Sequence, residues 1–148
     1  MRDLHRYQRI VVPTDGSLAA NTAVSHAVSI AVANDAEIHA VYVVDERVTM
    51  AATEKTRPEL VKTLEAEGES AVGSAEEFAS EHDISATTNI RSGTPAKEII
   101  EFAEEIEADL IVMGNSGRTA REKLIRMGSV SERVADNAMI PVLVVPRE

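Results

Sequence analysis

Five short apolar segments punctuate this chain, and the intervals between them are long enough to hold helices. The segments are RIVVPTD (9–15), AEIHAVYVVD (36–45), ISATTNIRSG (84–93), ADLIVMG (108–114) and IPVLVVP (140–146). Four of the five are continuous rather than alternating, which is typical of parallel strands that are buried on both faces. The third is weaker and alternates. We therefore expect five strands in one mostly parallel sheet.

The intervals carry helical patterns with cap residues at their starts. Ser17 is placed to cap a helix that runs to about Asn34, and Thr94 precedes a proline at the first helical position. Ser129 lies three residues before Glu132, which is the spacing of a capping box. Strand alternating with helix predicts an α/β fold: an open, Rossmann-like parallel sheet with helices on both faces and right-handed crossovers.

Two segments depart from this regular pattern. A long helical segment, 58–82, contains Gly68 and Gly73, which weigh against one unbroken helix. The segment 46–57 has no core periodicity, and we expect it to be a mobile loop. At 148 residues, the chain is expected to form a single domain over 1–148.

Composition excludes several classes of protein. The formal net charge of −10 argues against nucleic-acid binding, which depends on Lys and Arg to neutralise phosphates. No apolar stretch approaches the roughly 20 residues of a membrane span. The first eight residues hold no apolar stretch of the kind found in signal peptides, and there is no cysteine. A cytoplasmic protein is the simplest expectation.

The loop GNSGRTAREKLIRMGS (114–129) is rich in glycine and basic residues, although the chain as a whole is acidic. It follows the fourth predicted strand and leads into the last predicted helix. Ligands of open parallel sheets bind beyond the carboxyl ends of the strands, and helix N-termini attract phosphate. We interpret the loop as an anion site, favouring a phosphate chain. Turn formation alone is the alternative, and neither the Walker motif nor the G-x-G-x-x-G motif is present.

Several motifs together resemble the universal stress protein family. They are VVPTDGS and VYVVDE in the first third of the chain, then GTPAKEII, DLIVMGNSGRT, GSVSERV and the terminal PVLVVP. The resemblance covers nearly the whole chain. It implies a parallel sheet of order 3-2-1-4-5, a dimer formed through the last strand, and, in the branch with the motif G-x2-G-x9-G-[ST], bound ATP. A second branch lacks the glycines and does not bind ATP.

The resemblance also implies roles for residues of this chain. The adenosine end of the site would be lined by Pro13, Thr14 and Asp15, with Val43 contacting the adenine through its backbone. Met113 and Gly114 would lie against the ribose. The phosphates would be surrounded by Gly117, Gly128, Ser129, Val130 and Ser131. The implied ligand is ATP or AMP, with Mg²⁺ as an optional companion of the phosphates, and cyclic AMP is a variant.

One spacing departs from the family motif. Ten residues, not nine, separate Gly117 from Gly128. An extra residue in an irregular loop bulges outward and leaves the phosphate site intact. In a helical turn it would rotate the following residues by about 100° and displace Gly128 and Ser129. We expect the start of the last helix to be intact.

No set of residues has the pattern of a catalytic or metal site. The four histidines (5, 26, 39 and 82) are scattered, and we interpret each as structural or exposed. Asp15 has no second carboxylate among its sequence neighbours, so slow incidental ATP hydrolysis is the most we expect. We predict a nucleotide-binding regulatory protein of the stress response rather than an enzyme. The alternatives are an interaction module of the same fold without nucleotide, and a slow ATPase.

The last apolar segment predicts self-association. Residues 140–146 are apolar, β-branched and close to the end of the chain. An exposed edge strand of this kind invites aggregation, and pairing with its two-fold mate in a homodimer would cover it.

Overall fold

The computed structural model describes residues 4–115 and 128–146. Its strands form one sheet in the order β3-β2-β1-β4-β5, in which each neighbouring pair is parallel. The strands are β1 (Arg9–Pro13), β2 (Glu37–Asp45), β3 (Ala86–Gly93), β4 (Leu110–Gly114) and β5 (Val142–Val145). The predicted α/β fold class and the strand order implied by the resemblance are confirmed.

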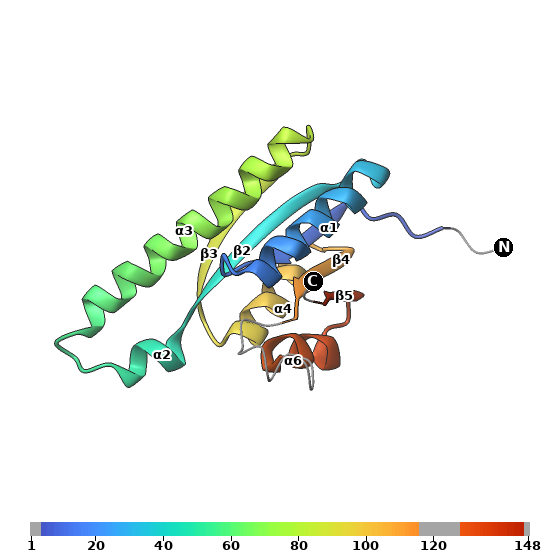
Figure 1. Ribbon diagram of the computed structural model, residues 1–148. Helices are drawn as coiled ribbons and strands as arrows, with labels where there is room; N and C mark the ends of the chain where they lie inside the picture. Colours follow the sequence, from blue (N-terminus) through green and yellow to red (C-terminus); the bar gives the residue numbers. More distant parts are fainter. Residues whose placement is uncertain (1–3, 116–127, 147–148) are drawn as a thin grey trace.

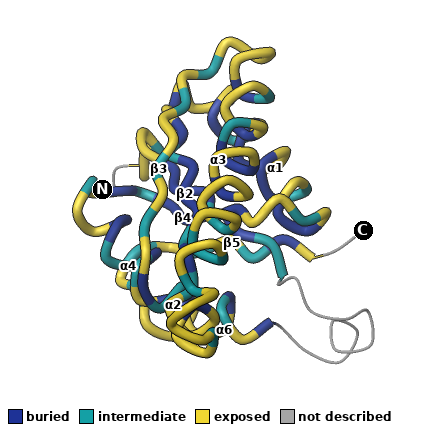
Figure 2. The backbone as a smooth tube through the Cα atoms, turned by 90° about the vertical axis from the view of Figure 1, so that its left-hand side faces the viewer, coloured by how far each residue is buried: buried dark blue, intermediate teal, exposed yellow. Residues whose placement is uncertain are grey.

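Helices cover both faces of the sheet. Helices α1 (Leu18–Asn34) and α3 (Arg57–Glu81) pack on one face, and α4 (Pro95–Glu105) and α6 (Ser129–Asn137) on the other (Figure 1). A short helix, α2 (Glu46–Ala51), lies beyond the carboxyl end of β2. Because strand residues alternate between faces, the molecule has two apolar cores, one on each side of the sheet. The buried residues follow the strands and the inner sides of the helices (Figure 2).

The positions of β1 and β3 in the sheet explain their different sequence patterns. The central strand β1 places Ile10, Val11 and Val12 at 0% exposure, which requires a continuous apolar run. By contrast, β3 lies at one edge of the sheet, where Thr87 and Thr88 are exposed. The weak alternation of the third segment therefore reflects a strand with solvent on one side.

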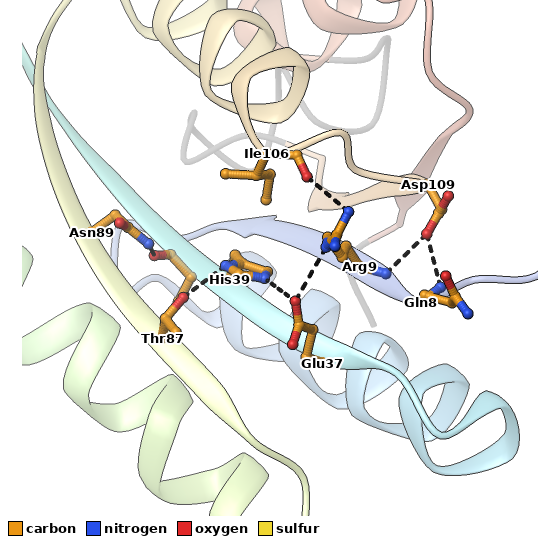
Figure 3. Close-up of polar contacts among 9 residues, drawn as sticks. Gln8, Arg9, Glu37, His39, Thr87, Asn89, Ile106 and Asp109 are labelled. Atoms are coloured by element: carbon orange, nitrogen blue, oxygen red, sulfur yellow. Dashed lines mark hydrogen bonds and ion pairs between the residues drawn. The ribbon is translucent and has the colours of Figure 1, made fainter.

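Polar side chains join the strands at their amino ends (Figure 3). Oδ2 of Asp109 accepts hydrogen bonds from the backbone N–H groups of residues 8 and 9, at 2.8 and 3.0 Å. On the face covered by α4, the ring of His39 lies 3.0 Å from a carboxylate oxygen of Glu37 and 2.8 Å from the hydroxyl of Thr87. His39 is thus a structural residue that links β2 to β3, and these contacts support the strand register.

The segment 46–57 is not the loop that the sequence suggested, because it contains α2. The Asp45 side chain caps the start of α2 by accepting a hydrogen bond from the backbone N–H of Arg47 at 2.9 Å. At the other end, the Arg57 guanidinium donates to the carbonyl oxygens of Thr49 and Ala52, both at 3.0 Å. A six-residue helix is too short to show a periodic apolar face, so these two side chains, rather than a core pattern, define it.

The long helix α3 is continuous through both glycines, contrary to the sequence interpretation. Gly68 faces the aromatic ring of Tyr42, and a Cβ atom at this position would overlap the ring. At Gly73, by contrast, an added Cβ atom would meet no heavy atom within 4 Å, so this position has no such steric requirement. The packing of α3 on β2 therefore outweighs the cost of about 1 kcal/mol that each glycine adds to a helix.

Candidate functional site

A cavity of about 290 Å³ opens at the carboxyl ends of the strands, where β1 is followed in the sheet by β4. This is the point at which the strand order reverses, and it is where open α/β sheets bind ligands. The cavity is bounded by the ends of β1, β2 and β4, the starts of α1 and α4, and the first turn of α6. Its lining residues are Pro13, Thr14, Asp15, Ser17, Ala19, Ala20, Val41, Tyr42, Val43, Asp45, Pro95, Ile99, Met113, Gly114, Val130 and Ser131.

The structure brings together most of the residues that the family resemblance singled out. Those that line the cavity are Pro13, Thr14, Asp15, Val43, Met113, Gly114, Val130 and Ser131. Gly128 and Ser129 are not among its lining residues, although they directly precede two that are. Gly117 lies outside the described residues, as do the basic residues 118, 121, 123 and 126.

The turn between β1 and α1 is held by its own polar side chains. The Thr14 backbone N–H donates to the Val41 carbonyl at 2.9 Å, directly after the last residue pair of β1 and β2. Asp15 Oδ1 accepts from the Ser17 N–H at 2.9 Å, and Ser17 Oγ accepts from the Ala20 N–H at 3.2 Å. The predicted cap of α1 is therefore confirmed. The turn presents Thr14 and Asp15 to the cavity in a fixed arrangement.

The edge of β2 beyond this turn is open toward the cavity. The pairing of β1 with β2 ends at Pro13 and Val41, and β2 continues to Asp45. In a strand, the carbonyl and N–H groups of residues i and i+2 point to the same side. Those of Val43 therefore point, like the Val41 carbonyl, toward the side that β1 has left. A backbone donor and acceptor are thus available to a ligand.

One wall of the cavity is apolar. It is formed by side chains from β1, β2, α4 and β4: Pro13, Val41, Val43, Pro95, Ile99 and Met113. Beside it, Gly114 approaches α1 so closely that a Cβ atom would lie 2.5 Å from the Ala19 carbonyl oxygen. A slot between these side chains suits a flat, apolar group with polar atoms at its rim.

The start of α6 is held beside the end of β4 by Asn115. Its side-chain Oδ1 accepts a hydrogen bond from the Gly128 backbone N–H at 2.7 Å, and its backbone N–H donates to the Val145 carbonyl at 3.0 Å. The expected intact start of the helix is confirmed, despite the longer spacing. Asn115 was missed by the sequence interpretation, because an asparagine close to two glycines reads as an ordinary turn residue.

The predicted capping box at this helix is wrong. The N-cap is Gly128, and Ser129 is the first helical residue, with an exposed side chain and no capping hydrogen bond. The hydroxyl of buried Ser131 instead donates to the Gly128 carbonyl at 3.1 Å. The Asn115 contact places Gly128 in the cap position. Without a capping side chain, the first N–H groups of α6 keep the positive end of the helix dipole beside the cavity. Thr94 is likewise the N-cap of α4 without a side-chain bond.

The charged residues that line the described part of the cavity are both acidic. Asp15 was expected there, whereas Asp45 is a second carboxylate that the sequence interpretation did not place in the site. Hydrogen bonds from Arg47 hold the pKa of Asp45 below its usual range. Burial, and secondarily Glu67 and Asp15, raise the pKa of Tyr42. At neutral pH the cavity therefore presents an ionised Asp45 and a neutral Tyr42.

The described residues contain no group of three or more His, Cys, Asp or Glu side chains that would hold a metal ion. Nor does any helix among them combine the length and apolar character needed to cross a bilayer.

The doubly wound sheet, with a cavity at its switch point, defines an α/β protein whose candidate site lies in the usual place for this class. The family model described as "Universal stress protein family" matches residues 6–146, and the chain belongs to that family. Universal stress protein MJ0531 of Methanocaldococcus jannaschii is 44% identical over 142 residues, which cover 95% of this chain and 83% of that protein.

Solved structures show the same similarity. The structure of hypothetical protein MJ0577 has a TM-score of 0.85 and 30% identity, covering 97% of this chain and 99% of that one. A universal stress protein in complex with cAMP has a TM-score of 0.68 and 27% identity, covering 97% of this chain and 100% of that one.

Proposed function

We propose that this protein binds an adenine nucleotide, ATP or AMP, in the cavity at the carboxyl ends of β1, β2 and β4. The observation that carries the proposal is the arrangement of the two ends of the cavity. An apolar wall with the open backbone edge of Val43 lies at one end, and the amino end of α6 lies at the other. The first suits a purine base, and the second suits a phosphate group. The related universal stress protein in complex with cAMP supports an adenine nucleotide.

In the proposed complex, the base lies against Val41 and Ile99, and Val43 pairs with its edge through backbone atoms. The sugar lies between Asp15 and Gly114. The phosphates reach the first turn of α6, where Val130 and Ser131 line the cavity. The residues fit the group, because Asp45 ends a strand two places away from β4 in the sheet, beside which α6 begins, and the phosphates meet the first N–H groups of α6. Mg²⁺ would accompany the phosphates as part of the ligand.

We propose a regulatory role in the stress response, with binding rather than turnover as the function. Asp15 is exposed and shares its carboxylate with the Ser17 N–H, so nothing in its described surroundings orients it as a general base. Occupancy of the site would be the signal. A bound nucleotide would stabilise the turn after β1 and the start of α6 together, because it contacts both.

Nucleotide binding is tested by thermal unfolding with and without ligand. At a concentration one hundred times the dissociation constant, a ligand stabilises the folded state by about 2.7 kcal/mol. For a domain of this size, that energy raises the melting temperature by roughly 5–10 °C. We expect such a shift with ATP and AMP, and a much smaller one with inorganic triphosphate, which lacks the base. Equal shifts with triphosphate and ATP would mean that the base is not recognised.

We also propose a homodimer formed through the edge strand in residues 140–146. On β5, Leu143 is 37% exposed, and Met139 in the preceding segment is 89% exposed. Pairing of β5 with a second copy would cover both residues and satisfy the free edge of the strand. Sedimentation at micromolar concentration is expected to give twice the chain mass of 16.0 kDa. A monomeric unmodified protein under these conditions would contradict the proposed dimer. If the dimer forms through β5, Leu143→Lys should convert it to a monomer.

A further inference from the structure

Asp45 stands where β2 ends; the residue lines the cavity, and its side chain caps α2. Its Oδ1 accepts hydrogen bonds from the backbone N–H and the Nε of Arg47, at 2.9 and 3.0 Å. Its Oδ2 accepts from Nη2 of the same guanidinium at 2.8 Å. The Asp45 side chain is 23% exposed, and Arg47 is not among the residues that line the cavity. The guanidinium that holds the carboxylate thus belongs to a residue outside the cavity lining.

The hydrogen bonds that the described residues make to this carboxylate leave one acceptor position unused. Each carboxylate oxygen accepts about two hydrogen bonds, so Oδ1 is fully used and Oδ2 has one position left. Because the hydrogen bonds from Arg47 lower the pKa of Asp45, the group is ionised at neutral pH and can only accept. The cavity thus contains a charged acceptor whose orientation is fixed before any ligand arrives.

The sheet order places this acceptor at the end of the cavity that is remote from α6. Two strand spacings, about 10 Å in all, separate β2 from β4, beside which α6 begins. Residues i and i+2 of a strand share a face, so Asp45 continues the line of Val41 and Val43 along the apolar wall. A ligand whose base pairs with the backbone of Val43 would bring the rim of that base to Asp45, with its phosphates toward α6.

We propose that Asp45, oriented by Arg47, accepts a hydrogen bond from the exocyclic amino group of adenine and so selects adenine over purines that carry a carbonyl oxygen at that position. This inference rests on the proposed function and names the specificity of the same site. A purine carbonyl oxygen would face the Asp45 carboxylate, and two acceptors cannot form a hydrogen bond with each other. A phosphate at this position would be repelled by the negative charge of Asp45. The same residue therefore fixes the direction in which the nucleotide lies.

The test compares AMP with inosine monophosphate (IMP), which has a carbonyl oxygen in place of the amino group. Asp45→Asn keeps a good helix cap, so α2 should remain in place. Its side-chain amide can turn a donor toward the base. By calorimetry at pH 7, we expect AMP to bind the variant about tenfold more weakly, as for the loss of one charge-assisted hydrogen bond, and IMP to bind equally well or more tightly.

The sign of this effect separates it from general electrostatics. Removal of one negative charge would by itself strengthen the binding of every anionic nucleotide. A loss for AMP alone is therefore specific. Glu46→Gln is the matched control, because Glu46 is the exposed neighbouring carboxylate, and it should leave the ratio of AMP to IMP affinity unchanged. Asp45→Ser provides a second variant that retains a cap.

Other results of these titrations would contradict either the role of Asp45 or nucleotide binding itself. An unchanged AMP to IMP ratio in Asp45→Asn would overturn the inference while leaving AMP binding itself established. A loss seen with AMP but not with 2′-deoxy-AMP would place the carboxylate on the sugar, which also overturns it. Failure of the unmodified protein to bind AMP would overturn the proposed function. Arg47→Gln should weaken AMP binding by a smaller factor and raise the pKa of Asp45 in an NMR titration; no change in either quantity would show that Arg47 does not orient Asp45.

Discussion

Gly128→Asp is expected to abolish nucleotide binding while leaving the fold at least as stable as before. Gly128 is the N-cap of α6, with φ −65° and ψ 154°, a conformation that any residue adopts. Aspartate is a favoured N-cap residue and would add a hydrogen bond that glycine cannot make. The same carboxylate would stand beside the proposed phosphate position. Two unit charges about 5 Å apart repel by about 3 kcal/mol at an effective dielectric constant of ~20, which corresponds to a loss of more than about 100-fold in affinity.

The control for this variant is Gly128→Asn, which has nearly the same size and capping ability without the charge. Calorimetric titration with AMP and ATP should show measurable binding to the asparagine variant and none to the aspartate variant. Melting temperatures of both should equal or exceed that of the unmodified protein. Equal affinity in the aspartate and asparagine variants would place the phosphates away from α6.

Gly114→Ala is expected to destabilise the protein strongly, although it adds a single methyl group. The Cβ atom would lie 2.5 Å from the carbonyl oxygen and 2.6 Å from the carbonyl carbon of Ala19. Both contacts are with backbone, so α1 and β4 must move apart, and the core between them opens. Overpacking of this kind costs typically about 1–3 kcal/mol, and we expect the upper part of that range because no side chain can yield. The melting temperature should fall by roughly 6–12 °C.

Gly73→Ala is the matched control, because it makes the same chemical change in an open position. No heavy atom lies within 4 Å of the new Cβ, and the residue is inside α3. Replacing a helical glycine with alanine stabilises a helix by about 0.5–1 kcal/mol, so the melting temperature should rise. Thermal denaturation of the two variants should therefore give shifts of opposite sign. A fall of less than about 2 °C in Gly114→Ala would show that the close approach of β4 to α1 is not required.

Strands β1, β2 and β4 were predictable from sequence because burial on both faces leaves a continuous apolar run. Their order came from the family resemblance, since alternation of strand and helix alone allows several orders. The helix α2 was not predictable from periodicity, because its six residues are defined by Asp45 at one end and the Arg57 guanidinium at the other. Likewise, the continuity of α3 depends on the ring of Tyr42, which is distant in sequence from Gly68.

The residues of the candidate site also fall into those that the sequence could locate and those that it could not. Residues at the ends of β1 and β4 could be located from the sequence, because the carboxyl ends of parallel strands meet at one edge. Asp45 could not be assigned to the cavity, since a polar residue after a strand is as often a helix cap as a ligand contact, and here it lines the cavity while serving as a cap. The role of Asn115 depends on a hydrogen bond to Gly128, thirteen residues away. Tertiary contacts of this length leave no local signal.

Whether this protein binds an adenine nucleotide is best decided by the nucleotide content of the purified protein. The protein is prepared without added ligand, denatured, and any released small molecule is identified by chromatography, with calorimetric titration of ATP and AMP on the folded protein. We expect either a co-purified adenine nucleotide or binding in the micromolar range. Folded protein that releases no nucleotide and gives no heat with millimolar ATP or AMP would contradict it, and would favour an interaction module of the same fold.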